Sequence, residues 1–315
     1  MLEKKEQILI EVLGDYQYSG KEILFYCPKC GFHKKKLSVN IEKNVYKCWF
    51  CDFRGKNLYY LIRKYGKSSQ KARWREISGI VDQSVEELRL FEDVVEETKP
   101  IDLPKEFKTL TKKEKSFPDY PPLNYLLKRG IDYDDMVWWK IGYCPDGEYG
   151  GRIIIPSFDL NGDINFFVAR NYLTKWKPYL NPPTPHNFIF NELYIDWSKP
   201  VTIVEGVFDA IKTENAIPLL GSTLREDSYV LKRLVEEVEG VWIGLDPDAS
   251  IVRYSKSKEQ KIIELLMKYG LNVYKLPISG YKDLGEMTKK EVSILKDKAK
   301  LITEDYFFEK MLENA

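Results

Sequence analysis

Four of the five cysteines of this 315-residue chain form two matching pairs, Cys27-x2-Cys30 and Cys48-x2-Cys51, with 17 residues between them. Each pair lies where an apolar, strand-like segment meets a turn, and four thiolates in this pattern bind zinc tetrahedrally. Because protein sulfurs fill every coordination position, we expect one structural, non-catalytic zinc ion. The segments ILFYC, KLSVNI and NVYKC around the pairs alternate as strands do, so residues 20–55 are expected to form a small metal-stapled sheet.

Two further residues of types that can bind zinc are not expected to be ligands. His33 is surplus to four sulfur ligands, and we expect it to be exposed in the knuckle loop, where it would be able to touch DNA. Cys144 is a lone cysteine, and such residues are most often buried and inert. A cytoplasmic location is expected for a chain that uses its cysteines for metal binding.

The charge of the chain is unevenly distributed, although its net value is only +1. Residues 1–75 contain 17 Lys and Arg against 7 Asp and Glu, whereas residues 76–107 contain 3 against 10. Lysines around the cysteine pairs alternate with aromatic residues, and cations with flat rings suit the phosphates and unpaired bases of single-stranded nucleic acid. The alternatives are a solvated lysine-rich surface and rings that fill the core beside zinc, and we expect rings in both places. The candidate DNA-binding residues are Lys34, Lys36, Trp49 and Arg54.

The order of segments predicts an α/β and α+β multidomain protein. Residues 1–75 form the zinc ribbon; residues 76–122 form a helical and acidic linker region rich in proline near its end. Residues 123–198 contain GRIIIPSFDL and INFFVARNY, two strand-like runs joined by a turn, and form a basic α+β subdomain. Residues 199–290 alternate strand and helix, which predicts a largely parallel sheet with right-handed crossovers. Residues 291–315 form a helical tail.

Acidic residues follow two strands of the predicted parallel sheet. Glu205 lies at the end of the strand in VTIVEG, and Asp209 follows four residues later, on the same face of a helix that would begin there. Asp246 is the last residue of VWIGLD, and Asp248 follows after Pro247. The carboxyl ends of parallel strands meet at one edge of a sheet, so these acids are expected to converge. Divalent cations offset the repulsion between gathered carboxylates, and magnesium prefers such oxygen ligands. Asp283 in GYKDLGEM is a candidate outer ligand.

A group of basic residues precedes the acids. Arg152 opens GRIIIPS, Arg170 lies in FFVARNY, and Lys175 and Lys177 come before PYLNPP. Arginine binds phosphate through two parallel hydrogen bonds, and these residues surround a hairpin that would face the acids. The four are therefore candidate phosphate-binding residues, and the alternative, for Lys175 in particular, is an ordinary solvated surface charge.

Membrane proteins and helicase motors are not expected. No apolar run approaches the length of a membrane-spanning helix, and the first residues lack a signal-peptide pattern. No GxxxxGK[ST] phosphate loop is present either, so the sequence predicts no helicase motor in this chain.

Taken in order, these segments resemble bacterial and bacteriophage DNA primases over nearly the whole chain. CPKC and KCWFC are similar to the primase zinc ribbon; KRGIDYDDMVWWKIGYCPDG, the GRIIIP hairpin and PYLNPP are similar to the basic half of the primase core. VTIVEGVFDAI, IGLDPDAS and KDLGEM are similar to the TOPRIM fold, a metal-binding module of topoisomerases and primases. The four-cysteine ribbon is most similar to that of stand-alone primases of myovirus-like tailed phages.

The resemblance implies an enzyme that synthesises RNA primers on single-stranded DNA from ribonucleoside triphosphates. It assigns catalysis to Glu205, Asp246 and Asp248 and about two Mg²⁺ or Mn²⁺ ions to these residues with Asp209 and Asp283. It also assigns Arg152 and Arg170, with the nearby Lys175 and Lys177, to the surface that binds nucleotide and template phosphates. It implies a place in the cytoplasm, which is that of the host for a phage protein.

The chain departs from the family pattern at three positions. Cys30 replaces a common histidine, Gly285 replaces a second acid after Asp283, and Pro178 replaces a lysine, for which Lys175 or Lys177 would substitute. Two other classes pair some of the same modules: a zinc and TOPRIM recombination mediator and a TOPRIM nuclease. The GRIIIP to PYLNPP segment distinguishes the primase prediction from both.

Overall fold

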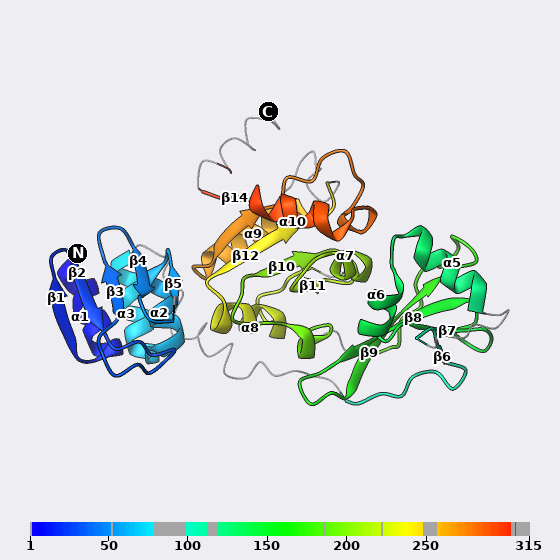
Figure 1. Cartoon of the computed structure of the whole chain (residues 1–315), viewed down its shortest axis with the longest axis horizontal. Coiled ribbons are helices and arrows are strands. Elements are labelled where there is room, and N and C mark those ends of the chain that lie inside the picture. Colours follow the sequence, from blue (N-terminus) through cyan, green and yellow to red (C-terminus); the bar gives the residue numbers. More distant parts are fainter. Residues whose placement is uncertain are drawn as a thin grey trace.

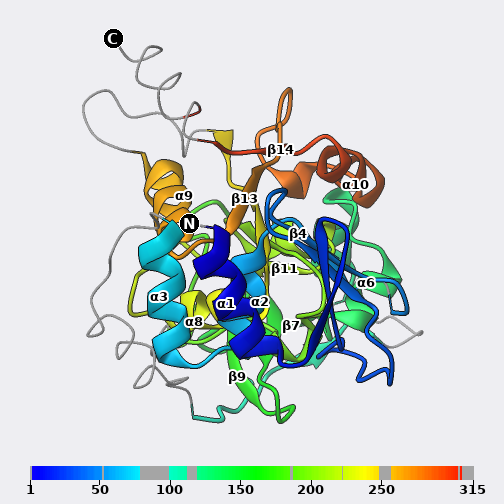
Figure 2. The ribbon, with the colours of Figure 1, turned by 90° about the vertical axis from the view of Figure 1, so that its left-hand side faces the viewer.

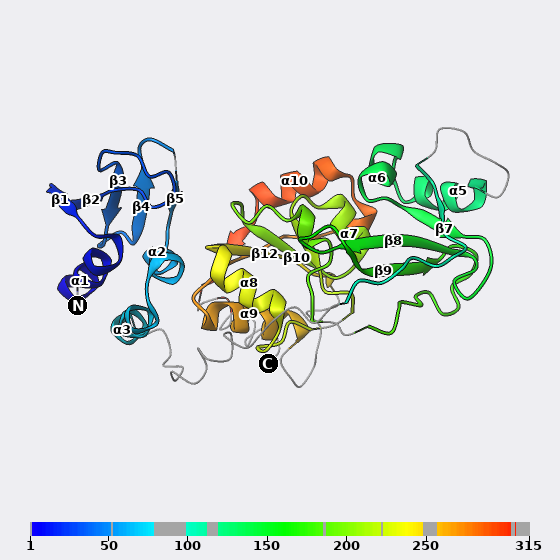
Figure 3. The same cartoon turned by 90° about the horizontal axis from the view of Figure 1, so that it is seen from below.

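The computed structural model describes residues 2–51, 53–78, 99–111, 119–184, 187–221, 223–247, 257–303 and 306. Within them, three sheets with their own helices follow one another along the long axis of the molecule (Figure 1). The amino-terminal sheet lies at one end, the largely parallel sheet lies in the middle, and the antiparallel sheet of residues 108–171 lies at the other end (Figures 1 and 3). The α/β and α+β fold class predicted from the sequence is confirmed.

The amino-terminal sheet is antiparallel throughout and pairs its strands in sequence order. Its strands are β1 (Tyr16–Ser19), β2 (Glu22–Phe25), β3 (Leu37–Asn40), β4 (Val45–Cys48) and β5 (Arg54–Gly55). The helices α1 (Leu2–Leu13), α2 (Leu58–Tyr65) and α3 (Ser68–Ser78) pack beside one another and stand in front of the rest of the molecule in Figure 2. Leu9, Phe25, Leu37 and Leu61 join sheet and helices in one core.

The antiparallel sheet at the far end has the order β6 (Lys108–Thr109), β7 (Gly142–Cys144), β8 (Arg152–Phe158) and β9 (Ile164–Asn171). The predicted hairpin is the β8–β9 pair, in which Ile154 lies opposite Ala169. Helices α5 (Tyr120–Lys128) and α6 (Tyr133–Trp138) accompany it. The strand β6 falls in the range predicted as linker; a two-residue strand carries no periodicity of its own, so the sequence pattern does not reveal it.

The middle sheet has the order β11 (Ala216–Pro218), β10 (Val201–Val204), β12 (Gly240–Gly244), β13 (Asn272–Lys275) and β14 (Lys300–Leu301). The first four pair in parallel and β14 is antiparallel to β13. The helices of this layer are α7 (Val207–Lys212), α8 (Tyr229–Glu237), α9 (Lys258–Lys268) and α10 (Lys289–Asp297). The predicted helical tail thus begins as α10 and then returns to the sheet as β14; most of residues 304–315 lie outside the described residues.

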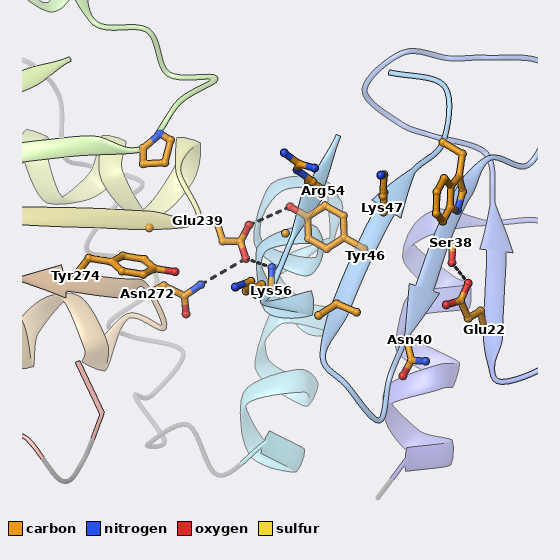
Figure 4. A pocket seen from close by; sticks show the side chains of 15 residues that line it. Glu22, Ser38, Asn40, Tyr46, Lys47, Arg54, Lys56, Glu239, Asn272 and Tyr274 are labelled. Atoms are coloured by element: carbon orange, nitrogen blue, oxygen red, sulfur yellow. Dashed lines mark hydrogen bonds between the residues drawn. The ribbon is translucent and has the colours of Figure 1, made fainter. Parts of the chain in front are cut away.

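The amino-terminal module, residues 2–78, is packed against the middle sheet through polar contacts. The Glu239 carboxylate accepts hydrogen bonds from the Lys56 backbone N–H at 2.7 Å and the Tyr46 hydroxyl at 3.3 Å (Figure 4). The buried Arg63 guanidinium donates to the Val238 carbonyl at 2.9 Å and to the Tyr269 carbonyl at 3.4 Å. Val238 and Glu239 directly precede β12, and Tyr269 comes shortly before β13. The module therefore lies at the amino-terminal edge of the parallel strands.

None of the helices in the described part of the chain is long and apolar enough to cross a membrane.

Candidate active site and metal centres

The four cysteines of the predicted zinc site lie together. One sulfur ligand atom from each of Cys27, Cys30, Cys48 and Cys51 falls within 4.8 Å of the others, and the Cys27 and Cys51 sulfurs are 3.8 Å apart. Four sulfurs at tetrahedral zinc distances are separated by about 3.8 Å, so this cluster fits a four-cysteine zinc site. His33 is exposed and is outside this group, as predicted.

The aromatic residues beside the cysteines divide between the core and the surface. Phe53 is 9% exposed and belongs to the module's core, whereas the Trp49 indole is 66% exposed with the Lys47 ammonium 4.5 Å from its ring centre. Lys34, Lys36 and Arg54 are exposed. A groove of about 430 Å³ runs from Trp49, Lys47 and Arg54 to Tyr274 of the core, with Glu239 between them (Figure 4). All four predicted DNA-binding residues are thus exposed, and Trp49 and Arg54 line this groove, whereas Lys34 and Lys36 do not.

The predicted acids lie where the parallel strands end. Glu205 directly follows β10, Asp246 comes two residues after the neighbouring β12, and Asp209 is in the first turn of α7. Asp283 begins the short 3-10 helix η4 (Leu284–Glu286), and its side chain accepts the Glu286 backbone N–H at 3.0 Å. Asp248 lies outside the described residues.

One cavity of about 390 Å³ brings Glu205, Asp209, Asp246 and Asp283 together. The same cavity is also lined by cationic, aromatic and amide side chains: Arg129, Arg170, Tyr179 and Asn181 from the basic subdomain, and Lys282 from the loop before η4. Acids that follow two parallel strands therefore share one space with cations from the basic subdomain. This juxtaposition is what a site for a metal-bound polyphosphate requires.

Asp209 is held more tightly than the other acids. Its two carboxylate oxygens accept the backbone N–H of Gly206 and of Gly285, each at 2.8 Å. Burial raises the pKa of the Asp209 carboxyl to about 6, and the charges of Asp283 and Glu205 act in the same direction. Crowded, partly desolvated carboxylates of this kind favour a bound cation.

The structure explains why glycine, and not a second acid, occupies position 285. A Cβ at this position would lie 3.1 Å from an Asp209 carboxylate oxygen and 3.2 Å from an Asp283 carboxylate oxygen. These contacts are tighter than ordinary van der Waals separations. The close approach of the two aspartates leaves little room for a side chain there.

The fit of divalent metal to the acids is partial in this arrangement. Among the described residues, the four cysteines are the group of at least three potential metal ligands whose ligand atoms lie within 4.8 Å of one another. The carboxylates of the cavity do not form such a group, because their oxygens are further apart. Both oxygens of Asp209 are already engaged by backbone. Glu205, Asp246 and Asp283 also line the cavity, so they would be the residues to hold a metal ion.

The four predicted basic residues do not all reach this cavity. Arg170 does, with its Nε donating to the Tyr125 hydroxyl at 2.9 Å and its guanidinium stacked on Tyr179 at 4.7 Å. Arg152 is buried at the start of β8 and donates to the Lys177 carbonyl at 3.0 Å. Lys175 and Lys177 are exposed and do not line the cavity. Arg152 thus holds the backbone before Tyr179 in place.

Sequence reasoning missed Arg129 and Lys282. The Arg129 guanidinium stacks on Phe208 at 4.5 Å and on Tyr125 at 5.1 Å, which aims it along the cavity wall. Arg129 ends α5 and Lys282 directly precedes Asp283. Arginine between a helix and a glycine turn is common, so only the proximity of Lys282 to a predicted acid offered a signal.

The sequence of the chain is similar to those of bacterial DNA primases. It is 24% identical over 289 residues to the DNA primase of Listeria innocua and 22% identical over 294 residues to that of Listeria monocytogenes; each match covers 72% of this chain and 46% of the relative. The chain spans about half the length of these curated relatives. A scan against protein-family models finds no match.

The solved structures agree with the sequence matches. The DnaG primase catalytic domain bound to single-stranded DNA superposes with a TM-score of 0.53 at 16% identity, over 63% of this chain and 78% of that one. The chain has the fold of a primase catalytic core. The Escherichia coli primase catalytic core gives a TM-score of 0.52, also at 16% identity, over 63% of this chain and 79% of that one.

Proposed function

We propose that this chain is a DNA primase, which joins ribonucleotides into short primers on a single-stranded DNA template. The observation that carries the proposal is the shared cavity: Glu205 and Asp246, at the ends of adjacent parallel strands, face Arg129 and Arg170 from the basic subdomain. The sequence and fold similarity to primases supports the same reaction.

In the proposed reaction, a ribonucleotide 3′ hydroxyl attacks the α-phosphorus of an incoming nucleoside triphosphate and pyrophosphate leaves. Divalent cations held by Glu205, Asp246 and Asp283, with Asp248 as a predicted further ligand, would activate the hydroxyl and neutralise the triphosphate. Arg129 and Arg170 would bind the phosphate oxygens in a fixed orientation, because stacking on aromatic rings limits the movement of both guanidinium groups. Lys282 would add charge beside Asp283.

The amino-terminal module would bind the template. Lys34, Lys36 and Arg54 would contact phosphates, and the exposed Trp49 indole would stack on a base. We further propose that a separate replicative helicase accompanies the protein. The four-cysteine ribbon supports a relationship with stand-alone tailed-phage primases, and such a protein would act in the cytoplasm of its host.

The test is to supply the protein with single-stranded DNA, ribonucleoside triphosphates and Mg²⁺ and to resolve the RNA products by length. Glu205→Gln and Asp246→Asn keep the side-chain shape but remove charge, so each is expected to reduce synthesis by orders of magnitude. Asp227→Asn is the matched control, because Asp227 is exposed and pairs with Arg225 away from the cavity. Near-normal primer yields from both acid variants would place the metal site elsewhere.

The same assay separates the alternative classes. A TOPRIM nuclease would share the acids and would shorten the DNA strand instead of producing RNA, and a recombination mediator would do neither. Neither alternative accounts for the wall that β9 and the PYLNPP segment contribute through Arg170, Tyr179 and Asn181. DNA cleavage that requires Glu205, without RNA synthesis, would favour the nuclease.

A further inference from the structure

Lys258 contacts the acid site from a helix that none of the predicted site residues occupies. Its ammonium lies 2.7 Å from Oε1 of Glu205, although the two residues are 53 positions apart in sequence. The side chains are 26% and 29% exposed, so the pair is partly shielded from water. Such a pair interacts more strongly than one on an open surface.

The backbone around Lys258 is fixed by its neighbours. Lys258 is the first residue of α9 and lies within a capping box formed by Ser257 and Gln260. The Ser257 hydroxyl accepts the Gln260 N–H at 3.1 Å, and Gln260 Oε1 accepts the Ser257 N–H at 2.9 Å. Ser257 is 1% exposed and Glu259 is 3% exposed, with Glu259 paired to Lys275. Buried residues on both sides therefore anchor the position from which the lysine reaches Glu205.

The two oxygens of the Glu205 carboxylate have different partners in this pair. Lys258 engages Oε1, which leaves Oε2 as the oxygen available to a further cation. A carboxylate fixed through one oxygen presents the other in a single orientation. At the same time, an ammonium beside a metal site repels a divalent ion and lowers the affinity of the site for it.

We propose that Lys258 is a positioning residue of the active site, which orients Glu205 and weakens metal binding so that the ion is held only as tightly as turnover requires. This inference rests on the proposed function. It assigns two separable consequences to one side chain: orientation, which supports synthesis, and charge, which opposes the metal.

The decisive measurement is Mn²⁺ binding to the full chain, followed through the electron paramagnetic resonance signal of free Mn²⁺ without nucleotide. Lys258→Met removes the charge and keeps the length of the side chain, and we expect it to bind Mn²⁺ about tenfold more tightly than the unaltered protein. Its primer synthesis at saturating metal is expected to fall about tenfold, since Glu205 loses its orientation. Lys258→Arg keeps the charge and is expected to restore the unaltered Mn²⁺ affinity and much of the synthesis.

The matched control is Lys261→Met, one turn along α9, where the lysine is exposed and outside the cavity. It should leave both measurements unchanged. A purely structural role for Lys258 predicts weaker or unaltered Mn²⁺ binding in Lys258→Met together with reduced stability, and that result would overturn the inference.

Failure of the proposed function has a different signature. Mn²⁺ binding that is unaffected by Glu205→Gln would show that the metal does not bind at this acid site, irrespective of the result for Lys258→Met. Loss of binding in Glu205→Gln combined with normal binding and synthesis in Lys258→Met would retain the acid site and reject the inference for Lys258 alone.

Discussion

Asp209 links two segments of the active site that are far apart in sequence. One oxygen holds the turn after β10 through Gly206, and the other holds the segment after Asp283 through Gly285. The sequence predicts Asp209 as a metal ligand, and these contacts favour a role in positioning Asp283 relative to Glu205. The distinction matters because a positioning acid and a ligand respond differently to replacement by the amide.

Asp209→Asn is therefore expected to lower stability instead of only removing charge. Asparagine has one acceptor oxygen, so one of the two backbone N–H groups loses its partner, at a cost of about 1–3 kcal/mol. Hydrogen exchange at the Gly206 or Gly285 amide should accelerate, and thermal unfolding without metal should occur at a lower temperature. Unchanged protection of both amides would show that the two hydrogen bonds are not important to the site.

Residues at strand ends were predictable, whereas residues that reach the site from elsewhere were not. Glu205 and Asp246 follow apolar strands, and the parallel-sheet pattern alone predicts their convergence. Arg129 and Lys258 enter from a helix end and a helix start whose positions depend on tertiary packing. Nothing in their local sequence separates them from ordinary solvated cations.

At the scale of the elements, the ribbon is the unit whose fold depends most on a ligand. Its strands are at most four residues long, and the cysteines lie at or just beyond strand ends. The periodicity of β2, β3 and β4 was visible in the sequence. The exposed β1 and the helix α1 were not predicted, because all four β1 residues face solvent and show no burial pattern.

Cys48→Ser is expected to loosen the ribbon while leaving the core folded. Cys48 is fully buried, and loss of one thiolate from a four-sulfur site removes much of the free energy that zinc supplies to folding. Elemental analysis should find one zinc per chain in the unaltered protein and less in the variant. Circular dichroism should retain the core transition. Full occupancy by another metal would contradict the zinc assignment.

Across the whole molecule, the arrangement of ribbon and core was the least predictable feature. The sequence predicts a linker region over residues 76–122 and carries no signal for a contact between ribbon and core. The contacts instead bury Arg63 against the Val238 and Tyr269 carbonyls, and such pairing between modules leaves no periodic signal in either one. The acidic segment expected between them falls largely outside the described residues.

The contact at Glu239 makes ribbon docking dependent on pH. Burial is the largest effect and raises the Glu239 pKa above its ordinary value of 4.5, while the Lys56 and Tyr46 hydrogen bonds oppose the shift. The docked form therefore binds a proton more readily than the undocked form. Docking is strongest below the ordinary pKa and weakens as the pH rises through the raised one.

Small-angle scattering at several pH values should detect this dependence as an increase in the radius of gyration toward higher pH. Glu239→Gln, which cannot ionise, is expected to remove the trend and to remain docked at neutral pH. Lys21→Ala, which removes an exposed ion pair on the same module, serves as the control. A pH trend that persists in Glu239→Gln would assign it to another group.

Gly55 allows the two modules to approach each other. A Cβ at this position would clash with Oε2 of Glu239 and lie 2.6 Å from the Tyr46 hydroxyl, so Gly55→Ala must displace the Glu239 side chain. The Lys56 N–H then loses its acceptor, and its hydrogen exchange is expected to accelerate about tenfold or more while zinc content stays unchanged. Normal Lys56 protection in the variant would show that docking does not depend on this contact.

Displacing the ribbon should affect initiation more than elongation. Trp49 lies with the module that docks at the amino-terminal edge of the sheet, whereas Glu205 and Asp246 lie at the opposite edge, about 16 Å away along the five residues of β12. If the ribbon binds the template as proposed, the docked ribbon would hold a template base away from the acids, and release of the ribbon would let the base approach them. Gly55→Ala is therefore expected to increase de novo initiation and to leave the extension of a preformed RNA primer unchanged, since the cavity residues are untouched. Parallel assays with and without that primer measure both quantities, and an equal change in the two would mean that the ribbon position does not govern initiation.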